Sequence, residues 1–203
     1  MGTFGDVDVL SREEFDAIEF DAACTGDHAA AAERMTALAR TGIQTESMPR
    51  AEAFVRAGEQ WLLADNPGAA ANGFRMAIAD GGPYDVDPRV SLCRALFQMG
   101  SKEEALALIG QLESEGKSDP RACDMIAELL VEQGDLAGAL EWSTAGVELI
   151  LQGGWSPSAR SAGRLRAAQT EPYAGLDELL RLRYRIRNDL RLPEDEYDRM
   201  LSA

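Results

Sequence analysis

Apolar residues recur every three or four positions along this chain, in blocks of helical length that Gly, Pro, Asn or Asp interrupt. The clearest blocks lie between residues 88 and 152. Two stretches there have one form: an apolar helix, a glycine, a polar turn, and a second apolar helix with an alanine five residues after the glycine. Gly100 and Gly134 are 34 residues apart, and so are Ala105 and Ala139. A fixed period of this size predicts stacked pairs of helices.

The same spacing predicts four helical hairpins between residues 12 and 152. The first starts at the N-cap signal Ser11, and the second runs from Pro49 to a break at Gly81. The third covers about 88–116 and the fourth about 120–152. The apolar residues that this helical spacing places on the packed faces are Phe15, Ile18, Ala22, Ala23, Ala31, Met35, Leu38, Phe54, Ala57, Gly58, Trp61, Leu62, Ala70, Phe74, Ala77, Ile78, Leu92, Cys93, Leu96, Leu106, Ile109, Leu112, Ile126, Ala127, Leu130, Leu136, Ala139, Leu140 and Val147.

The repeat pattern divides the chain into three parts. We expect residues 1–11 to be a mobile leader, residues 12–152 to be the helical array, and residues 153–203 to be a helical extension. The extension predicts a short helix at about 158–169 and an amphipathic helix at 174–191. The second helix carries five arginines beside its apolar face. Its Leu and Ile residues could cap the array, because terminal repeats need a polar outer face.

These hairpins resemble the tetratricopeptide repeat, a helix-turn-helix unit of 34 residues. The turn positions are Gly26, Asp65, Gly100 and Gly134, at spacings of 39, 35 and 34 residues. The small residue of the second helix in this family matches Ala31, Ala70, Ala105 and Ala139, and the following large position holds Met35, Phe74, Ile109 and Ser143. The paired positions in the first helix match Ala57-Gly58, Leu92-Cys93 and Ile126-Ala127, whereas Ile18-Glu19 departs from the pattern.

The resemblance implies an all-α fold: a right-handed superhelix of about four stacked helix-turn-helix repeats with a C-terminal capping helix. It also implies that the first helix of each hairpin lines a concave groove that binds a protein or peptide. The positions implied to contact the partner are Val55, Glu59, Leu62, Val90, Arg94, Phe97, Gln98, Asp124, Glu128 and Val131. Family members that clamp a terminal carboxylate use Lys and Asn where this chain has Val55 and Glu59, so a basic or amphipathic segment is the better ligand.

The charge of the chain also favours a basic ligand. Its formal net charge is −15, which disfavours wrapping of nucleic acid. Residues 1–152 hold 11 basic and 27 acidic residues, whereas residues 156–191 hold 8 arginines and 4 acids. The basic segment could dock on the acidic array. The alternative function is a regulatory protein that contacts nucleic acid through the Arg-rich helix.

No motif predicts catalysis or a bound cofactor or metal. The GQLESEGKS stretch from Gly110 has one residue too many for a phosphate-binding loop and follows a helix. His28 is the single histidine, placed in a turn and expected to be solvated, and Cys24, Cys93 and Cys123 lack metal-ligand spacing. We therefore expect a cytoplasmic, non-enzymatic protein without a membrane span, and leave a homodimer open. An enzyme using groove carboxylates is the third hypothesis, but no catalytic constellation supports it.

Overall fold

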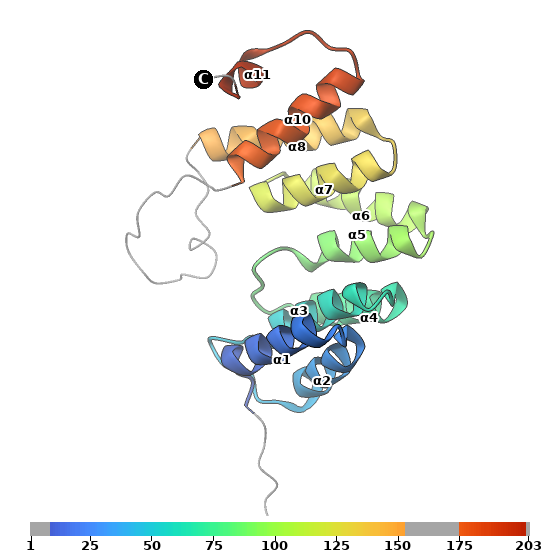
Figure 1. The fold of residues 1–203 in the computed structure, drawn as a ribbon, viewed down its shortest axis with the longest axis vertical. Helices are drawn as coiled ribbons and strands as arrows, with labels where there is room; N and C mark the ends of the chain where they lie inside the picture. Colours follow the sequence, from blue (N-terminus) through green and yellow to red (C-terminus); the bar gives the residue numbers. More distant parts are fainter. Residues whose placement is uncertain (1–8, 153–174, 202–203) are drawn as a thin grey trace, which may run out of the picture. The chain divides into compact units, whose positions relative to one another are not determined.

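The computed structural model describes residues 9–152 and 175–201, and this part of the chain is helical apart from loops and one isolated parallel bridge between Val9 and Ile43 (Figure 1). The helices are α1 (Arg12–Thr25), α2 (His28–Thr41), α3 (Arg50–Leu63), α4 (Pro67–Asp80), α5 (Pro88–Gln98), α6 (Lys102–Glu115), α7 (Pro120–Glu132), α8 (Leu136–Leu151), α10 (Leu176–Asp189) and α11 (Glu196–Met200). The all-α prediction is confirmed. The short helix predicted at 158–169 lies outside the described residues.

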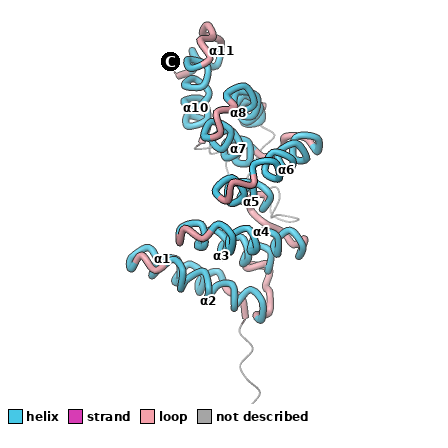
Figure 2. The backbone as a smooth tube through the Cα atoms, turned by 90° about the vertical axis from the view of Figure 1, so that its right-hand side faces the viewer, coloured by secondary structure: helices cyan, strands magenta, loops and turns pink. Residues whose placement is uncertain are grey.

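Helices adjacent in sequence pack against one another in two compact units, Met1–Leu108 and Ile109–Ala203. In the first unit α1 packs on α2, α2 on α3, α3 on α4 and α4 on α5. In the second unit α7 packs on α8 and α8 on α10, as the tube drawing lets the reader follow (Figure 2). The largest fully buried side chains include Phe15, Met35, Phe74 and Leu96 in the first unit and Ile126, Leu129, Leu179 and Ile186 in the second. Each helix therefore buries its apolar face against a neighbour.

Side chains at the helix starts fix where seven of the described helices begin. An Asp, Asn or Ser immediately before the helix accepts a hydrogen bond from a backbone N–H of the first turn, which satisfies a donor that has no partner within the helix. The capping residues are Ser11, Asp27, Asn66, Asp87, Asp119, Asp135 and Asp195. Proline follows the cap at α4, α5 and α7, where its missing N–H costs nothing.

The ends of four helices share one hydrogen-bonded closure. A residue with positive φ stands just after α3, α5, α7 and α10: Asp65, Gly100, Gly134 and Arg191. In each case the N–H of the next residue donates to a carbonyl five positions back, as Asn66 does to Trp61 and Leu192 does to Arg187. This 6→1 bond is the Schellman closure that ends a helix and reverses the chain. α10 therefore ends as the first helix of a hairpin does, and α11 stands where a second helix would follow.

Small residues allow the helices within a unit to approach closely. A Cβ added at Gly58 of α3 would lie 2.6 Å from the Phe74 ring of α4, and one at Gly73 would lie 3.3 Å from the Gly58 Cα. In the second unit a Cβ at Gly146 of α8 would lie 3.0 Å from Cys123 of α7 and 3.1 Å from Leu179 of α10. Helix pairs can come this near only where one side lacks a side chain.

The substitution Gly58→Ala should lower the free energy of unfolding by about 1–3 kcal/mol, because Phe74 is fully buried and has no room to move. The matched control is Gly110→Ala in α6, where an added Cβ meets nothing within 4 Å. Relief of the helix-interior glycine should stabilise that variant by about 0.5–1 kcal/mol. Urea unfolding followed by circular dichroism measures both. Equal midpoints for the two variants would contradict this account of the α3–α4 contact.

The structure corrects three expectations from the sequence. Leu10, assigned to a mobile leader, is 1% exposed, and its N–H donates to the Ile43 carbonyl at 2.8 Å. Ile78 and Leu106, assigned to the buried face, are 38% and 40% exposed. Met48, which the helical spacing did not assign to the core, is fully buried in the loop before α3. The linker before α3 thus contributes apolar packing of its own, which helical periodicity does not detect.

A buried ion cluster joins α10 to α11. Arg183 Nη2 lies 2.5 Å from Asp195 Oδ2 and its Nη1 lies 3.3 Å from Asp198 Oδ1, while Arg187 Nε donates to Asp198 Oδ2 at 2.9 Å. Arg183 also donates to Thr144 of α8 at 2.9 Å and stacks on the Tyr197 ring. Bonding to Arg183, partly opposed by desolvation, lowers the pKa of Asp195 to about 2. We call these four charged residues the C-terminal clasp.

Loss of the guanidinium at the centre of the clasp should destabilise the second unit strongly. The side chains of Arg183 and Asp198 are 5% and 4% exposed, so Arg183→Met leaves the two clasp carboxylates, Asp198 buried, sharing the one charge of Arg187, at a cost of about 3–5 kcal/mol. Arg181→Met is the control, because the Arg181 side chain is 68% exposed and its pair with Asp177 should contribute less than about 1 kcal/mol. Thermal unfolding compares the two, and similar melting temperatures would contradict a structural role for the clasp.

Candidate binding surface

Nine of the ten predicted contact residues fall at three equivalent places, ten, six and three residues before the left-handed residue that ends each first helix, whereas Gln98 lies two residues before Gly100. Position ten holds Val55, Val90, Asp124 and, on α10, Arg181. Position six holds Glu59, Arg94, Glu128 and Arg185, and position three holds Leu62, Phe97, Val131 and Asn188. Counting back from Gly26 places Phe20 of α1 at position six as well. The sequence prediction omitted the α10 members, because the turn residue there is Arg191 rather than glycine.

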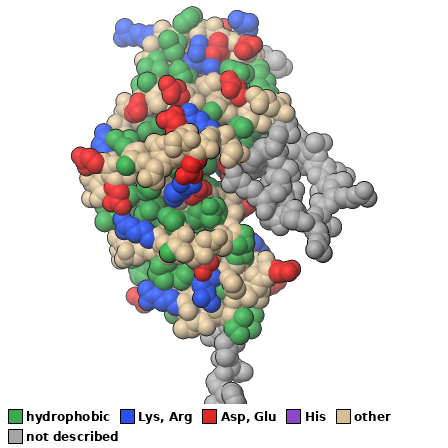
Figure 3. Space-filling view, turned by 180° about the vertical axis from the view of Figure 1, so that it is seen from behind, with side chains coloured by type: hydrophobic (Ala, Val, Ile, Leu, Met, Phe, Trp, Pro, Cys, Tyr) green, Lys and Arg blue, Asp and Glu red, His purple; other side chains and the backbone are tan. Residues whose placement is uncertain are grey.

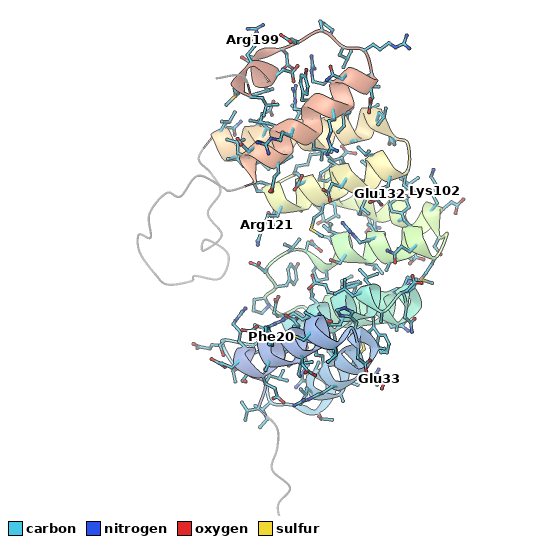
Figure 4. The ribbon with its side chains drawn as sticks, in the orientation of Figure 1. Phe20, Glu33, Lys102, Arg121, Glu132 and Arg199 are labelled. Carbon is cyan, nitrogen blue, oxygen red and sulfur yellow. The ribbon has the colours of Figure 1, made fainter. Side chains whose placement is uncertain are left out.

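The three positions differ in exposure. Val55 and Val90 are 7% and 0% exposed, so they pack inside the first unit and have no surface to offer a partner. Leu62, Phe97 and Val131 are half-buried, as are Arg94 and Asp124, whereas Glu59, Gln98 and Glu128 are exposed. Phe20 is 74% exposed on the outside of α1 (Figure 4). Position six is therefore exposed on α1, α3, α7 and α10 but half-buried on α5, and it carries charged side chains or, on α1, an aromatic ring.

Arg56 fixes the first helix of the first unit. Its guanidinium donates to Glu19 at 2.8 and 2.6 Å and to Asp16 at 2.6 Å, and it lies 5.6 Å from the centre of the Phe15 ring. Burial disfavours the Arg56 charge, but hydrogen bonds to Glu19 and Asp16 outweigh that effect and raise its pKa above the ordinary range. α1 and α3 are thereby joined through charge, and the Glu19 carboxylate also acts on Glu59.

Glu59 is the carboxylate of this surface whose pKa its surroundings shift. Desolvation by the surrounding helices, followed by the charges of Glu52 and Glu19, raises the pKa of Glu59 to about 7, although Arg56 and Arg94 act in the opposite direction. Part of the residue remains in contact with solvent. This surface of the first unit therefore holds a carboxylate that gains or loses its charge near neutral pH.

The raised pKa of Glu59 predicts a pH-dependent stability. Below about pH 4.5 the group is protonated in both folded and unfolded chains, and as pH rises to about 7 only the unfolded chain ionises fully, so stability falls. Solvent screening at this exposed residue limits the loss to about 1 kcal/mol. Glu59→Gln should remove this loss, and urea unfolding at pH 4.5 and 7.5 measures it. Glu33→Gln on α2 is the control, and a decline of equal size in wild type and Glu59→Gln would rule out Glu59 as its source.

In the second unit a surface groove of about 480 Å³ separates α7 from α10. The wall on α7 carries Asp124 and Glu128. The opposite wall carries Glu178, Arg181, Leu182, Tyr184 and Arg185. Desolvation, then the charges of Glu128 and Glu178, raises the pKa of Asp124 to about 6. Two predicted contact residues, Asp124 and Glu128, are thus brought together with residues of the C-terminal helix.

The remaining candidates for chemistry are used in packing. His28 begins α2 directly after the turn and is half-buried, and its Nδ1 lies 2.9 Å from Gln60 Oε1, a contact that the sequence did not predict. Burial raises the pKa values of Cys93 and Cys123 to about 12, which keeps both as thiols. Gly116 ends α6 with φ +95°, beside Lys117, which pairs with Glu113 and lies over the Trp142 ring.

Two further features bear on the kind of site. Within residues 9–152 and 175–201, no group of three or more His, Cys, Asp or Glu side chains is placed to hold a metal ion. None of the helices in these ranges combines the length and the apolarity that a bilayer crossing requires. On the face shown in Figure 3, acidic, basic and apolar side chains lie interspersed.

Comparisons of the chain with protein-family models, curated proteins and solved structures found no match. A function for this chain therefore has to be inferred from its own residues and their geometry.

Proposed function

We propose that this chain is a non-enzymatic protein-interaction scaffold of tetratricopeptide-like type that binds a basic or amphipathic segment of a partner protein. The observation that carries the proposal is the groove between α7 and α10, where Asp124 and Glu128 lie on one wall and Leu182 and Tyr184 on the other. A surface that combines carboxylates with apolar side chains suits a ligand with cationic and apolar side chains.

The first unit offers a second surface of the same character. Glu59 and Phe20, both at position six of a first helix, are exposed, and Glu52 and Glu19 add negative charge near Glu59. Exposed aromatic residues supply much of the binding energy in protein interfaces, and rim charges steer the partner. An amphipathic segment could use either surface.

The arginines of α10 are less available to nucleic acid than the sequence indicates. The side chains of Arg183 and Arg187 are only 5% and 12% exposed, because both belong to the C-terminal clasp. Arg181 pairs with Asp177 at 3.3 Å. A basic footprint for phosphates requires several exposed cations on one face, so the peptide-binding function is favoured over the nucleic-acid alternative.

Selection of peptides from a random displayed library on the immobilised full-length chain tests the proposed function. Enriched sequences should carry a net positive charge together with Leu, Ile or aromatic residues. Their affinity should fall as salt rises from 50 to about 500 mM, because salt screens exposed charge pairs. Enrichment of acidic peptides, or none above an uncoated surface, would contradict the proposal.

A further inference from the structure

The groove between α7 and α10 exists because α10 packs mainly on α8. Leu179 and Leu180 of α10 form a buried cluster with Val147 of α8, and Gly146 of α8 lets Leu179 approach closely. The opposite side of α10 is left facing α7 across the groove, where Tyr184 is 37% exposed. The groove is therefore a fixed feature of the packing, with an apolar floor at Leu182, which is 5% exposed.

The two walls carry opposite charges at equivalent positions. Asp124 and Glu128 of α7 stand ten and six residues before Gly134, and Arg181 and Arg185 of α10 stand ten and six residues before Arg191. Residues four apart lie on one side of a helix, so each wall presents a pair of like charges along its length. Glu178 adds a third carboxylate to the groove.

Asp124 and Arg185 do not pair with each other across the groove. Across the described ranges, neither Asp124 nor Arg185 has a hydrogen bond or ion pair, and Arg181 is held by Asp177 on its own helix. The carboxylates of Glu128 and Glu178 act on Asp124 as like charges, and desolvation adds to their effect. A cation that enters the groove would stabilise the ionised form of Asp124, which is half-buried beside two other carboxylates. Arg185 on the other wall is available to an anion.

We propose that this groove binds an amphipathic helix of a partner protein that presents arginine or lysine toward Asp124 and Glu128, a carboxylate toward Arg185, and an apolar side chain toward Leu182 and Tyr184. This inference rests on the proposed protein-binding function and specifies its ligand. A helix fits because its own side chains four residues apart match the spacing of both walls.

Protonation of Asp124 should weaken the complex. Its pKa of about 6 in the free chain, raised by desolvation and by Glu128 and Glu178, means that the carboxylate loses its charge as pH falls below 6. Arg181 and Arg185 remain charged throughout this range. Affinity for a cation at Asp124 should therefore decline between pH 7 and 5, and the decline should be smaller in Asp124→Asn.

Synthetic helical peptides of about 15 residues test the proposal on the full-length chain. The first peptide places an arginine stripe and a glutamate stripe on either side of a leucine stripe. The second has the same composition, with arginine and glutamate mixed within each stripe. The third replaces all charged residues by glutamine. Amide NMR shifts locate binding and fluorescence anisotropy measures its affinity. We expect the first peptide to bind at least tenfold more tightly than the others and to shift residues around 124–128 and 181–185.

Asp124→Asn and Arg185→Gln should each weaken binding of the first peptide about three- to tenfold. Glu141→Gln, an exposed carboxylate of α8 outside the groove, should leave it unchanged. Equal affinity of the three peptides, or an unchanged affinity in both groove variants, would overturn the proposal. Shifts confined to the surface around Glu59 would overturn this groove assignment and leave the binding function standing. If the random library also yields no binder, both the groove assignment and the proposed binding function are wrong.

A second copy of the chain is the competing occupant of the groove. If the groove joined two copies, sedimentation would show a dimer that Asp124→Arg converts to a monomer, and that result would also overturn the proposal. A monomer that binds the first peptide in a one-to-one complex supports it.

Discussion

The backbone reversal after each first helix is the constraint on which the hairpins depend. A residue with positive φ at Asp65, Gly100, Gly134 and Arg191 allows the 6→1 hydrogen bond that ends the helix, and only then can the following segment turn back. Glycine adopts this conformation without cost, whereas Asp65 and Arg191 do so against steric strain of about 1–2 kcal/mol. The closure offsets that strain by satisfying terminal carbonyl groups that have no partner within the helix.

Once the chain reverses, two buried arginines hold the terminal helices. Arg56 bonds Asp16 and Glu19 of α1, and Arg183 bonds Asp195 and Asp198 beside and within α11. Apolar burial alone holds these two helices weakly, because α1 contains charged residues through most of its length and α11 has only five residues. A buried ion cluster adds little net stability over an apolar contact, but it requires one geometry, because a displaced partner leaves a charge without compensation. The two arginines therefore determine the positions of α1 and α11 within their own units more than they add to the stability of those units.

Much of this follows from sequence because local signals determine it. Asp, Asn or Ser before a helix, Pro in its first turn and Gly100 or Gly134 after it act through neighbouring atoms, and the helix boundaries were predictable to within about two residues. The turn at Arg191 was not predictable, since an arginine at positive φ has no local preference for that conformation. Burial of Leu10 and Met48, and the choice of Arg183 rather than a leucine for the inner face of α10, depend on contacts between segments distant in sequence. Val55 and Val90 show the same limit for the candidate surface, because a position transferred from a repeat pattern does not specify how deeply the helix is buried.

Recognition of α10 as a first helix changes how its arginines are understood. Taken as a separate basic segment, its five arginines form one positive face. Arg191 is the turn residue itself, and alignment on it divides the other four into two sets: Arg183 and Arg187 point into the clasp, while Arg181 and Arg185 occupy the places that Asp124 and Glu128 hold on α7. The charge reversal at these places affects the groove directly, since a neighbouring repeat with carboxylates there would have given two acidic walls. Because the two walls differ in charge, the groove can bind the cationic edge and the anionic edge of a helix at the same time. The two directions in which such a helix can lie in the groove therefore differ in binding free energy, even though the overall charge of the ligand is the same.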